Sequence, residues 1–318
     1  MQSKQVQFVG ANIEVGQTHK GLSQSAAQFL SYLCKSKKSV SFDINSELSV
    51  TAEVRHKSPR SFRKQDLNQI DFSAYKKLAE INDKILQKRN IALNFGGDHS
   101  IAVATVEASL RSNPKTHIIW IDAHADANSA EQSFTGSFHG MPVYYLMMNR
   151  KNRPACMDWM RSSLHPAQIT YVGLRDIDPF EIKLLNDLQI DYFTSDFIRT
   201  NGLKKVIDRI QFKNKLFDNI HLSFDIDSLD PKYGLCTGVP ALGGLEIDDV
   251  FHIFETVRES NKLTNFDFVE VNPKLANSQA ELDQIYGLAV QLIQAAVPAK
   301  SQPSPTHFKE EIYANLSY

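Results

Sequence analysis

The stretch IIWIDAHADAN, residues 118–128, begins as an apolar run and ends in three ionisable side chains at alternate positions: Asp122, His124 and Asp126. In an extended chain, residues two apart point to the same side, so these three groups would crowd one face at the end of a strand. Like charges at close range raise one another's pKa, and burial disfavours ionisation. The stretch therefore predicts a buried strand that delivers ionisable groups to one place, where something must compensate their charge.

Short runs rich in β-branched and aromatic residues alternate with longer amphipathic stretches along the chain, which is the pattern of βα units around a parallel sheet. Several runs are apolar on both faces, as expected of strands covered by helices on both sides. The predicted strands are 6–10, 91–95, 117–122, 169–174, 220–227 and 266–272. The predicted helices are 22–34, 75–88, 101–111, 180–188, 203–212, 247–260 and 281–296. The pattern indicates the α/β class.

The chain of 318 residues is 42% apolar and 10% aromatic, enough for a sizeable core. We expect one domain over residues 1–297, followed by a tail over 298–318 that begins with PAKSQPSP. With 35 basic and 36 acidic residues, the chain has no overall attraction to nucleic acid or to an anionic membrane. The basic run at 55–64 is typical of a solvated loop, and no segment approaches the ~18 continuous apolar residues of a membrane span.

Cysteine usage and the N-terminal residues bear on the compartment. Cys34, Cys156 and Cys236 form no CxxC pair and leave an odd cysteine, which favours a reducing compartment. The first residues lack the cationic start and apolar run of a secretory signal. We therefore expect a cytoplasmic protein, and we interpret Cys236 as a small apolar filler.

Two more polar segments follow predicted strands, NFGGDHS (94–100) and SFDIDSLD (223–230). In an open α/β sheet, ligands bind at the carboxyl edge of the strands, so all three segments can converge there. The convergence would bring together four carboxylates and two imidazoles: Asp122, Asp126, Asp225, Asp227, His99 and His124. Two divalent cations would balance the four negative charges, and a carboxylate-rich set with few imidazoles suits Mn²⁺ better than zinc or copper. The sequence therefore predicts two Mn²⁺ ions, which together can produce a nucleophile from water.

A capping role is the alternative explanation for a single aspartate at a strand end, and we adopt it for Asp98 and Asp230. For the DxHxD and DxD sets, that explanation would leave six charged or polar groups with no Lys or Arg in the motifs to pair with them. The glycine pairs at 96–97 and 243–244 predict tight turns, because neither GxGxxG nor GxxxxGK[ST] surrounds them.

Six segments occur in an order that resembles the ureohydrolases, the manganese enzymes that include arginase, agmatinase and formimidoylglutamase. They are GGDHS (96–100), DAHADAN (122–128), FTGSFHGMP (134–142), GLRDIDPFE (173–181), SFDIDSLDP (223–231) and EVNP (270–273). The resemblance extends from Gly10 and the GQTHKG segment (16–21) to about Ala296. It implies a three-layer α/β sandwich with a central, mainly parallel sheet, a binuclear manganese cluster and a homo-oligomer.

The resemblance also implies roles for individual residues. Carried over by motif, His99, Asp122, Asp126 and Asp225 would hold one ion, and Asp122, His124, Asp225 and Asp227 the other. A hydroxide shared by the two ions would attack the guanidinium carbon of the substrate and release urea and an amine. Asp126 would orient the hydroxide, His139 would shuttle protons, Glu270 would receive the guanidinium group, and Thr237 would support the site of that glutamate.

The far end of the substrate distinguishes the members of this family. The resemblance assigns its recognition to Asn128, Thr135, Ser137, Asp178 and Glu181. An acidic pair suits an α-ammonium group, small polar side chains can bind an α-carboxylate through water, and EVNP is closer to arginases than the EVSP common in agmatinases. Two segments depart from the arginase pattern. TGSFHG stands where arginases have SGNLHG, so Ser137 replaces an asparagine, and CTGVP replaces an ATG-like turn.

We therefore expect hydrolysis of L-arginine to L-ornithine and urea. The alternatives are hydrolysis of agmatine, another guanidino acid or formimidoylglutamate, a non-catalytic protein on the same fold, and a zinc deacylase of the distantly similar deacetylase fold. The last group lacks the full four-aspartate arrangement.

Overall fold

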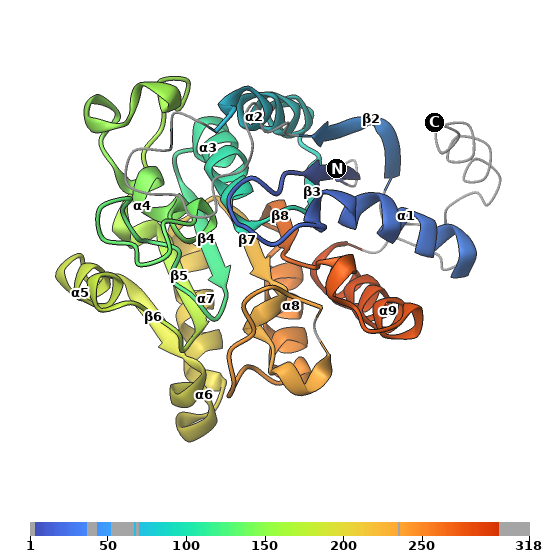
Figure 1. The fold of residues 1–318 in the computed structure, drawn as a ribbon. Helices are drawn as coiled ribbons and strands as arrows, with labels where there is room; N and C mark the ends of the chain where they lie inside the picture. The colour runs from blue at the N-terminus through green and yellow to red at the C-terminus, as the bar shows by residue number, and fades with distance from the viewer. Residues whose placement is uncertain (1–3, 37–42, 52–66, 68–69, 235, 299–318) are drawn as a thin grey trace.

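A computed structural model describes residues 4–36, 43–51, 67, 70–234 and 236–298 (Figure 1). Its centre is one eight-stranded sheet with the order β2-β1-β3-β8-β7-β4-β5-β6, in which every described pair of neighbours is parallel. The strands are β1 (Val6–Asn12), β2 (Asp43–Thr51), β3 (Ile91–Phe95), β4 (Thr116–Ile121), β5 (Ile169–Leu174), β6 (Asp191–Thr194), β7 (Asn219–Asp225) and β8 (Leu263–Val269).

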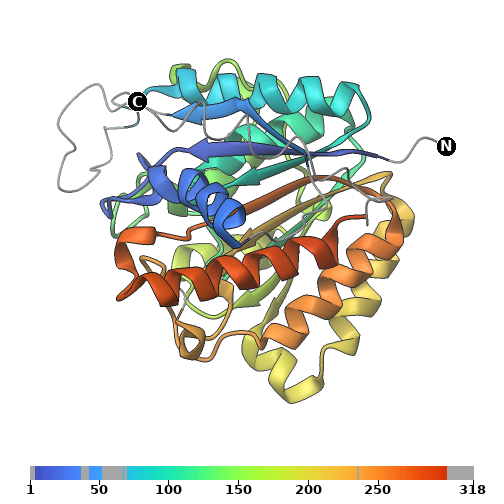
Figure 2. The same cartoon turned by 90° about the vertical axis from the view of Figure 1, so that its right-hand side faces the viewer.

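Helices cover both faces of the sheet, which confirms the three-layer α/β sandwich (Figures 1 and 2). One layer contains α2 (Phe72–Gln87), α3 (Ala102–Ser112), α4 (Pro142–Met147) and α5 (Pro179–Asp187). The other contains α1 (Ser25–Ser36), α6 (Ser195–Asn201), α7 (Lys204–Leu216), α8 (Ile247–Ser260) and α9 (Gln279–Ala296).

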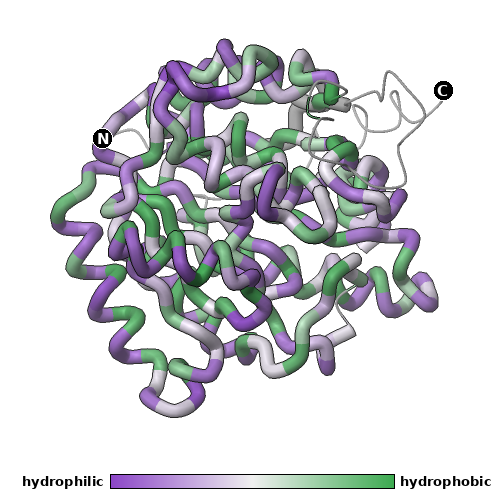
Figure 3. The backbone as a smooth tube through the Cα atoms, turned by 60° about the vertical axis from the view of Figure 1, so that its left-hand side comes forward, coloured by the Kyte–Doolittle hydropathy of each residue, from purple (hydrophilic) through white to green (hydrophobic). Residues whose placement is uncertain are grey.

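Strand β4 shows why the sheet is buried on both sides. All six of its residues are buried, and alternate side chains enter different cores. Ile119 and Ile121 pack with the layer of α1 and α6–α9, whereas Ile118 and Trp120 pack with the layer of α2–α5. Hydrophilic and hydrophobic residues alternate along the helices in Figure 3, as expected of helices with one buried face.

Not every buried strand position is apolar. Asn94 on β3 donates to the side chains of Asn265 (2.7 Å) and Asp267 (2.8 Å) on β8. Asp267 also lies 3.0 Å from Nε2 of His221 on β7 and accepts a hydrogen bond from Thr105 on α3. Burial of these groups is tolerated because each has partners. The hydrogen bonds link three of the strands that approach the predicted site.

The predicted elements are present, with shifted ends and four omissions. Strands β2 and β6 lie at the two edges of the sheet. They were missed because six of the nine residues of β2 (DINSELSVT) are polar and β6 has only four, partly exposed residues. The short helices α4 and α6 were missed too. The strand predicted over 220–227 ends at Asp225, because the Asp225 carboxylate accepts a hydrogen bond from the Asp227 N–H (2.8 Å) and turns the chain.

Some predictions fall outside the description. The basic run at 55–64 and the tail from residue 299 lie outside the described residues. Among the helices that are described, none has both the length and the apolar character to cross a bilayer.

Candidate metal centre

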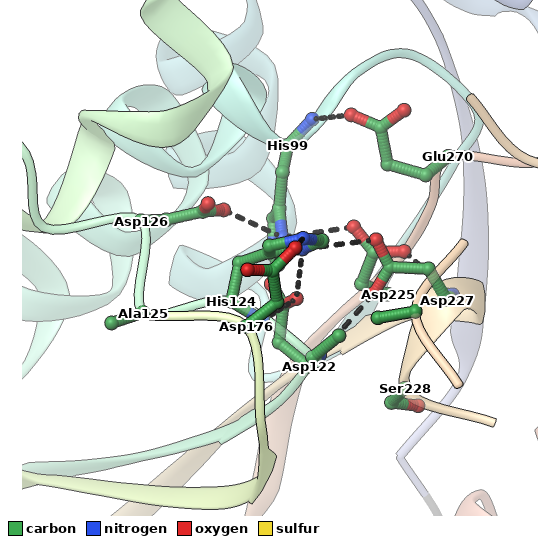
Figure 4. Close-up of polar contacts among 12 residues, drawn as sticks. His99, Asp122, His124, Ala125, Asp126, Asp176, Asp225, Asp227, Ser228 and Glu270 are labelled. Atoms are coloured by element: carbon green, nitrogen blue, oxygen red, sulfur yellow. Dashed lines mark hydrogen bonds and ion pairs between the residues drawn. The ribbon is translucent and has the colours of Figure 1, made fainter. Parts of the chain in front are cut away.

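Four adjacent strands, in the order β3-β8-β7-β4, deliver the predicted ligands to one edge of the sheet. His99 follows β3, Glu270 follows β8, Asp225 ends β7, and Asp122 follows β4. The carboxyl ends of parallel strands meet at the same edge, so side chains up to 171 positions apart in the sequence become neighbours. Figure 4 shows the six predicted metal ligands pointing toward one another, with Glu270 beside them.

The first group of potential ligands surrounds His99. Its Nδ1 atom lies 2.8 Å from Oδ2 of Asp122, 3.1 Å from Oδ2 of Asp126 and 3.4 Å from Oδ2 of Asp225. This nitrogen is buried and forms no hydrogen bond, although three carboxylate oxygens are near it. Nitrogen and oxygen atoms that come together without a hydrogen bond between them are better suited to bind a metal cation than to form a hydrogen-bonded cluster.

The second group surrounds His124. Its Nδ1 atom lies 3.1 Å from Oδ2 of Asp227 and 3.4 Å from Oδ1 of Asp122. One set that could hold a metal ion consists of His99, Asp122 and Asp126. A second set consists of Asp122, His124 and Asp227. Asp122 belongs to both sets through its two different oxygens, as a bridging carboxylate would. The six residues predicted as metal ligands therefore lie together.

Four contacts that the sequence did not reveal orient these side chains. The indole N–H of Trp120 donates to Oδ2 of Asp122 (3.0 Å), and the indole ring stacks on the imidazole of His99 with centroids 4.1 Å apart. Oγ of Ser223 lies 2.8 Å from Nε2 of His99, and Asp176 lies 3.5 Å from Nε2 of His124. Such outer partners fix the ring orientation of histidines whose other nitrogen binds a metal.

Burial dominates the electrostatics of the cluster. It raises the pKa of Asp225 well above its usual range, and the nearby Asp227 and Asp122 carboxylates raise that pKa further. Burial also raises the pKa of Asp126 to about 6, with a contribution from Asp122. Burial lowers the pKa of His99, but the surrounding carboxylates outweigh it and hold that pKa well above the usual value. The cluster is therefore short of positive charge, which divalent cations could supply.

Glu270 forms a second feature beside the cluster. Its Oε1 atom accepts a hydrogen bond from the backbone N–H of His99 (2.9 Å) and lies 3.1 Å from Nδ1 of His139. Its Oε2 atom accepts a hydrogen bond from Nε2 of Gln17 (2.6 Å). Burial lowers the pKa of His139, but the Glu270 carboxylate raises it more, to about 9.

Two carboxylates of the site stand on unusual backbone. Asp126 has φ 49° and Glu270 has φ 66°, in the left-handed region that non-glycine residues rarely adopt. Non-glycine residues in this region concentrate at functional sites, where the surrounding structure holds them in place. No sequence pattern indicated this conformation at either position.

The residues predicted to meet the far end of the substrate fall into two groups. Nδ2 of Asn128 donates to Oδ2 of Asp178 (2.8 Å), and the buried Oδ1 of Asn128 has no partner. Glu181 uses both carboxylate oxygens on backbone N–H groups, of Ala127 (2.8 Å) and of Asp178 (3.0 Å). Burial raises the pKa of Glu181 to about 8. In this geometry Glu181 holds the segments after β4 and β5 together.

The remaining predicted residues lie on loops. Thr135 is exposed, and its Oγ1 accepts the N–H of the half-buried Ser137 (3.1 Å). Oγ1 of Thr237 is buried without a hydrogen-bond partner. Cys236 is buried, and burial raises the pKa of its thiol to about 11, in agreement with a filler role.

The capping and turn predictions are confirmed. Asp98 accepts hydrogen bonds from the N–H groups of Ser100 (3.1 Å) and Gly16 (2.7 Å). Asp230 accepts hydrogen bonds from the N–H groups at 232, 243 and 244. Gly97 has φ 81°, and a Cβ there would lie 2.6 Å from the carbonyl oxygen of Ala11, so the turn requires glycine.

The sheet and the carboxylate–histidine cluster define an α/β protein with a candidate binuclear metal centre at the carboxyl edge of its strands. A family model described as the arginase family matches residues 4–297, and the chain belongs to that family.

Known relatives agree with this assignment. Arginase-2, mitochondrial, of Rattus norvegicus is 36% identical over 230 residues, which cover 70% of this chain and 64% of that protein, so the match spans less than two thirds of the relative's length. The structure of the arginase from Bacillus caldovelox has a TM-score of 0.79 and 26% identity, and covers 94% of this chain and 100% of that one. The Entamoeba histolytica arginase in complex with L-ornithine has a TM-score of 0.75 and 28% identity, with 92% and 99% covered.

Proposed function

We propose that this protein hydrolyses the guanidinium group of L-arginine to L-ornithine and urea and depends on two Mn²⁺ ions. The observation that carries the proposal is a set of buried acceptors without donors around the cluster. Oε1 of Gln17 and Oγ1 of Thr237 have no hydrogen-bond partner in the described part of the chain. A guanidinium group has only donors and a positive charge, so it matches both these acceptors and the carboxylate of Glu270.

The metal ions would occupy the two groups of ligands described above. His99, Asp122, Asp126 and Asp225 would hold one ion, and Asp122, His124, Asp225 and Asp227 the other. When bound, such a pair would lower the pKa of water and supply a nucleophile near neutral pH.

The protein's own residues would position the substrate and move protons. Glu270, whose oxygens are fixed by His99 N–H and Gln17, would hold the guanidinium group. The Asp126 carboxylate would accept a proton from the attacking water. Nδ1 of His139 faces Glu270, which leaves Nε2 to donate a proton to the leaving amine. With its pKa raised to about 9, His139 carries that proton at neutral pH.

The far end of the substrate supports an amino acid over agmatine. The Asp178 carboxylate is held by Nδ2 of Asn128 (2.8 Å), so it is already placed to receive an ammonium group. Agmatine has no α-carboxylate, and it would leave the small polar side chains of Thr135 and Ser137 unused. We infer L-arginine as the preferred substrate.

Urea release in the presence of Mn²⁺ tests the proposal. We expect release from L-arginine to exceed release from agmatine, guanidinobutyrate and formimidoylglutamate. Asp227→Asn should abolish it, whereas the matched surface change Asp187→Asn should leave it intact, because Asp187 is an exposed residue of α5 that pairs with Lys183. Preferred release from another compound would overturn the choice of L-arginine. No release from any of the compounds, together with no Mn²⁺ binding, would overturn the hydrolase.

The remaining expectations concern the setting of the protein. We infer a cytoplasmic homo-oligomer that takes a small guanidino substrate and has no nucleic acid or membrane partner. Light scattering of the purified protein tests the oligomer, since a monomer at working concentration would contradict it.

A further inference from the structure

The segment between β1 and α1 is held rigidly against the site. Oε2 of Glu14 accepts hydrogen bonds from the N–H groups of Gly21 (2.8 Å) and Ser23 (3.1 Å). Gly16 donates its N–H to the buried Asp98 (2.7 Å), and its carbonyl oxygen accepts the N–H of His139 (3.1 Å). A Cβ on Gly16 would lie 2.7 Å from an oxygen of Asp98, so the close approach requires glycine. These contacts fix the position of the next residue, Gln17.

Gln17 lies beside the proposed guanidinium receptor. The residue is only 2% exposed, and its Nε2 atom donates to Oε2 of Glu270 at 2.6 Å. The same nitrogen lies 3.5 Å from Nδ1 of His139. The other end of the amide, Oε1, is buried and has no hydrogen-bond partner. A buried carbonyl without a donor is unfavourable, so a ligand that brings a donor would be bound there.

The loop that faces Gln17 points to the same conclusion. A Cβ on Gly238 would lie 3.1 Å from Oε1 of Gln17 and 3.0 Å from Nδ1 of His19, so the loop passes close to the amide. The preceding residue, Thr237, presents a second buried oxygen without a partner. The Cys236 carbonyl accepts the N–H of Asn272 (2.7 Å), which ties this loop to the segment that carries Glu270.

We propose that Gln17 is a second binding residue for a planar guanidinium or amidinium group. Nε2 of Gln17 fixes the Glu270 carboxylate, and Oε1 accepts an N–H from the ligand. The two oxygens of Glu270 can accept two of the five N–H groups of a guanidinium, and the others need different acceptors. This inference rests on the proposed function, because it names a further residue for the same substrate.

Replacement of Gln17 by methionine tests the proposal. Methionine has similar length and no strong hydrogen-bonding group, so it removes both the acceptor and the donor to Glu270 with little change in shape. We expect KM for L-arginine to rise about 10- to 100-fold, the loss of one hydrogen bond to a charged group. The inhibition constant of L-ornithine, which lacks the guanidinium group, should change less than about 3-fold. Gln291→Met, at an exposed position on α9, is the matched control and should change neither constant.

Two outcomes would overturn the role of Gln17. One is an unchanged KM for L-arginine, and the other is an equal weakening of L-arginine and L-ornithine, which would indicate general damage to the site. If Gln17→Met does not fold, Gln17→Asn retracts the amide by one methylene and is judged by the same ratio of constants. If the wild-type protein releases no urea, the proposed function fails. Calorimetric titration of the wild type and the Gln17 variant with L-arginine and L-ornithine then decides the role of Gln17 separately.

Discussion

Manganese binding should release protons, because the structure raises the pKa of the two imidazoles proposed as ligands. The carboxylates around His99 and His124 hold both imidazole pKa values well above the usual value, although burial lowers them, which favours the protonated rings when no metal is bound. A metal ion binds only the neutral ring. Each imidazole that is protonated without metal must therefore lose one proton, so the overall binding constant should rise about 10-fold per pH unit for each such ring.

Metal binding should also raise the stability of the folded protein. A metal ion present at 100 times its dissociation constant stabilises the folded state by about 2.7 kcal/mol. For a chain of 318 residues, an unfolding entropy of about 2.1 cal/mol/K per residue converts this to a rise in Tm of about 4 °C. The rise should shrink as the pH falls, because protons compete for the same nitrogen atoms.

Titration calorimetry in two buffers of different ionisation enthalpy counts the released protons. His124→Gln should release about one proton fewer than the wild-type protein. His252→Gln, on the exposed side of α8, should change nothing. Binding that releases no proton and has the same affinity at pH 6 and pH 8 would refute the reasoning, since the imidazoles would then not be ligands.

Three substitutions test other parts of the site. His139→Asn should lower kcat. Because the pKa of His139 is raised to about 9, the kcat of the wild-type protein should also fall above pH 9, whereas the kcat of the variant should not depend on pH there. Parallel pH profiles of the two proteins would contradict the role of His139. Trp120→Phe removes the indole donor to Asp122 and should lower the free energy of unfolding by about 1.5–3 kcal/mol and weaken Mn²⁺ binding. Denaturant titration and calorimetry check both effects, and no change in either would count against the contact. Arg175→Lys removes the guanidinium group that donates to the carbonyl oxygens at 227–229. It should lower the free energy of unfolding by about 2 kcal/mol or more in a denaturant titration. An unchanged unfolding midpoint would show that this guanidinium group is dispensable.

The sequence was sufficient to locate the cluster because its ligands interrupt apolar runs at strand ends. Asp122 and Asp225 each come at the end of a run of buried residues that predicts a strand. Their clustering follows from the rule that parallel strands end at one edge of the sheet. The grouping of these residues with His99 in the structure follows from this rule. Which two strands flank β8 could not be read from the sequence, since strand order depends on long-range packing.

The supporting contacts could not be predicted in the same way. Trp120 and Ser223 occupy strand positions where they look like ordinary core residues, and only the register of β4 beside β7 reveals what they touch. Gln17 precedes its partner Glu270 by 253 positions. Glu181 lies in one of the motifs shared with the ureohydrolases, yet both of its carboxylate oxygens accept hydrogen bonds from backbone N–H groups. In each case a three-dimensional contact decides the role.

The left-handed backbone at Asp126 and Glu270 has a consequence for laboratory evolution. An L-residue in this conformation is disfavoured by roughly 1–2 kcal/mol, whereas glycine adopts it freely. Replacement by glycine at these two positions should therefore raise thermal stability but remove a carboxylate that the proposed reaction needs. A population selected for thermal resistance alone should collect replacements at 126 and 270 and lose its catalysts.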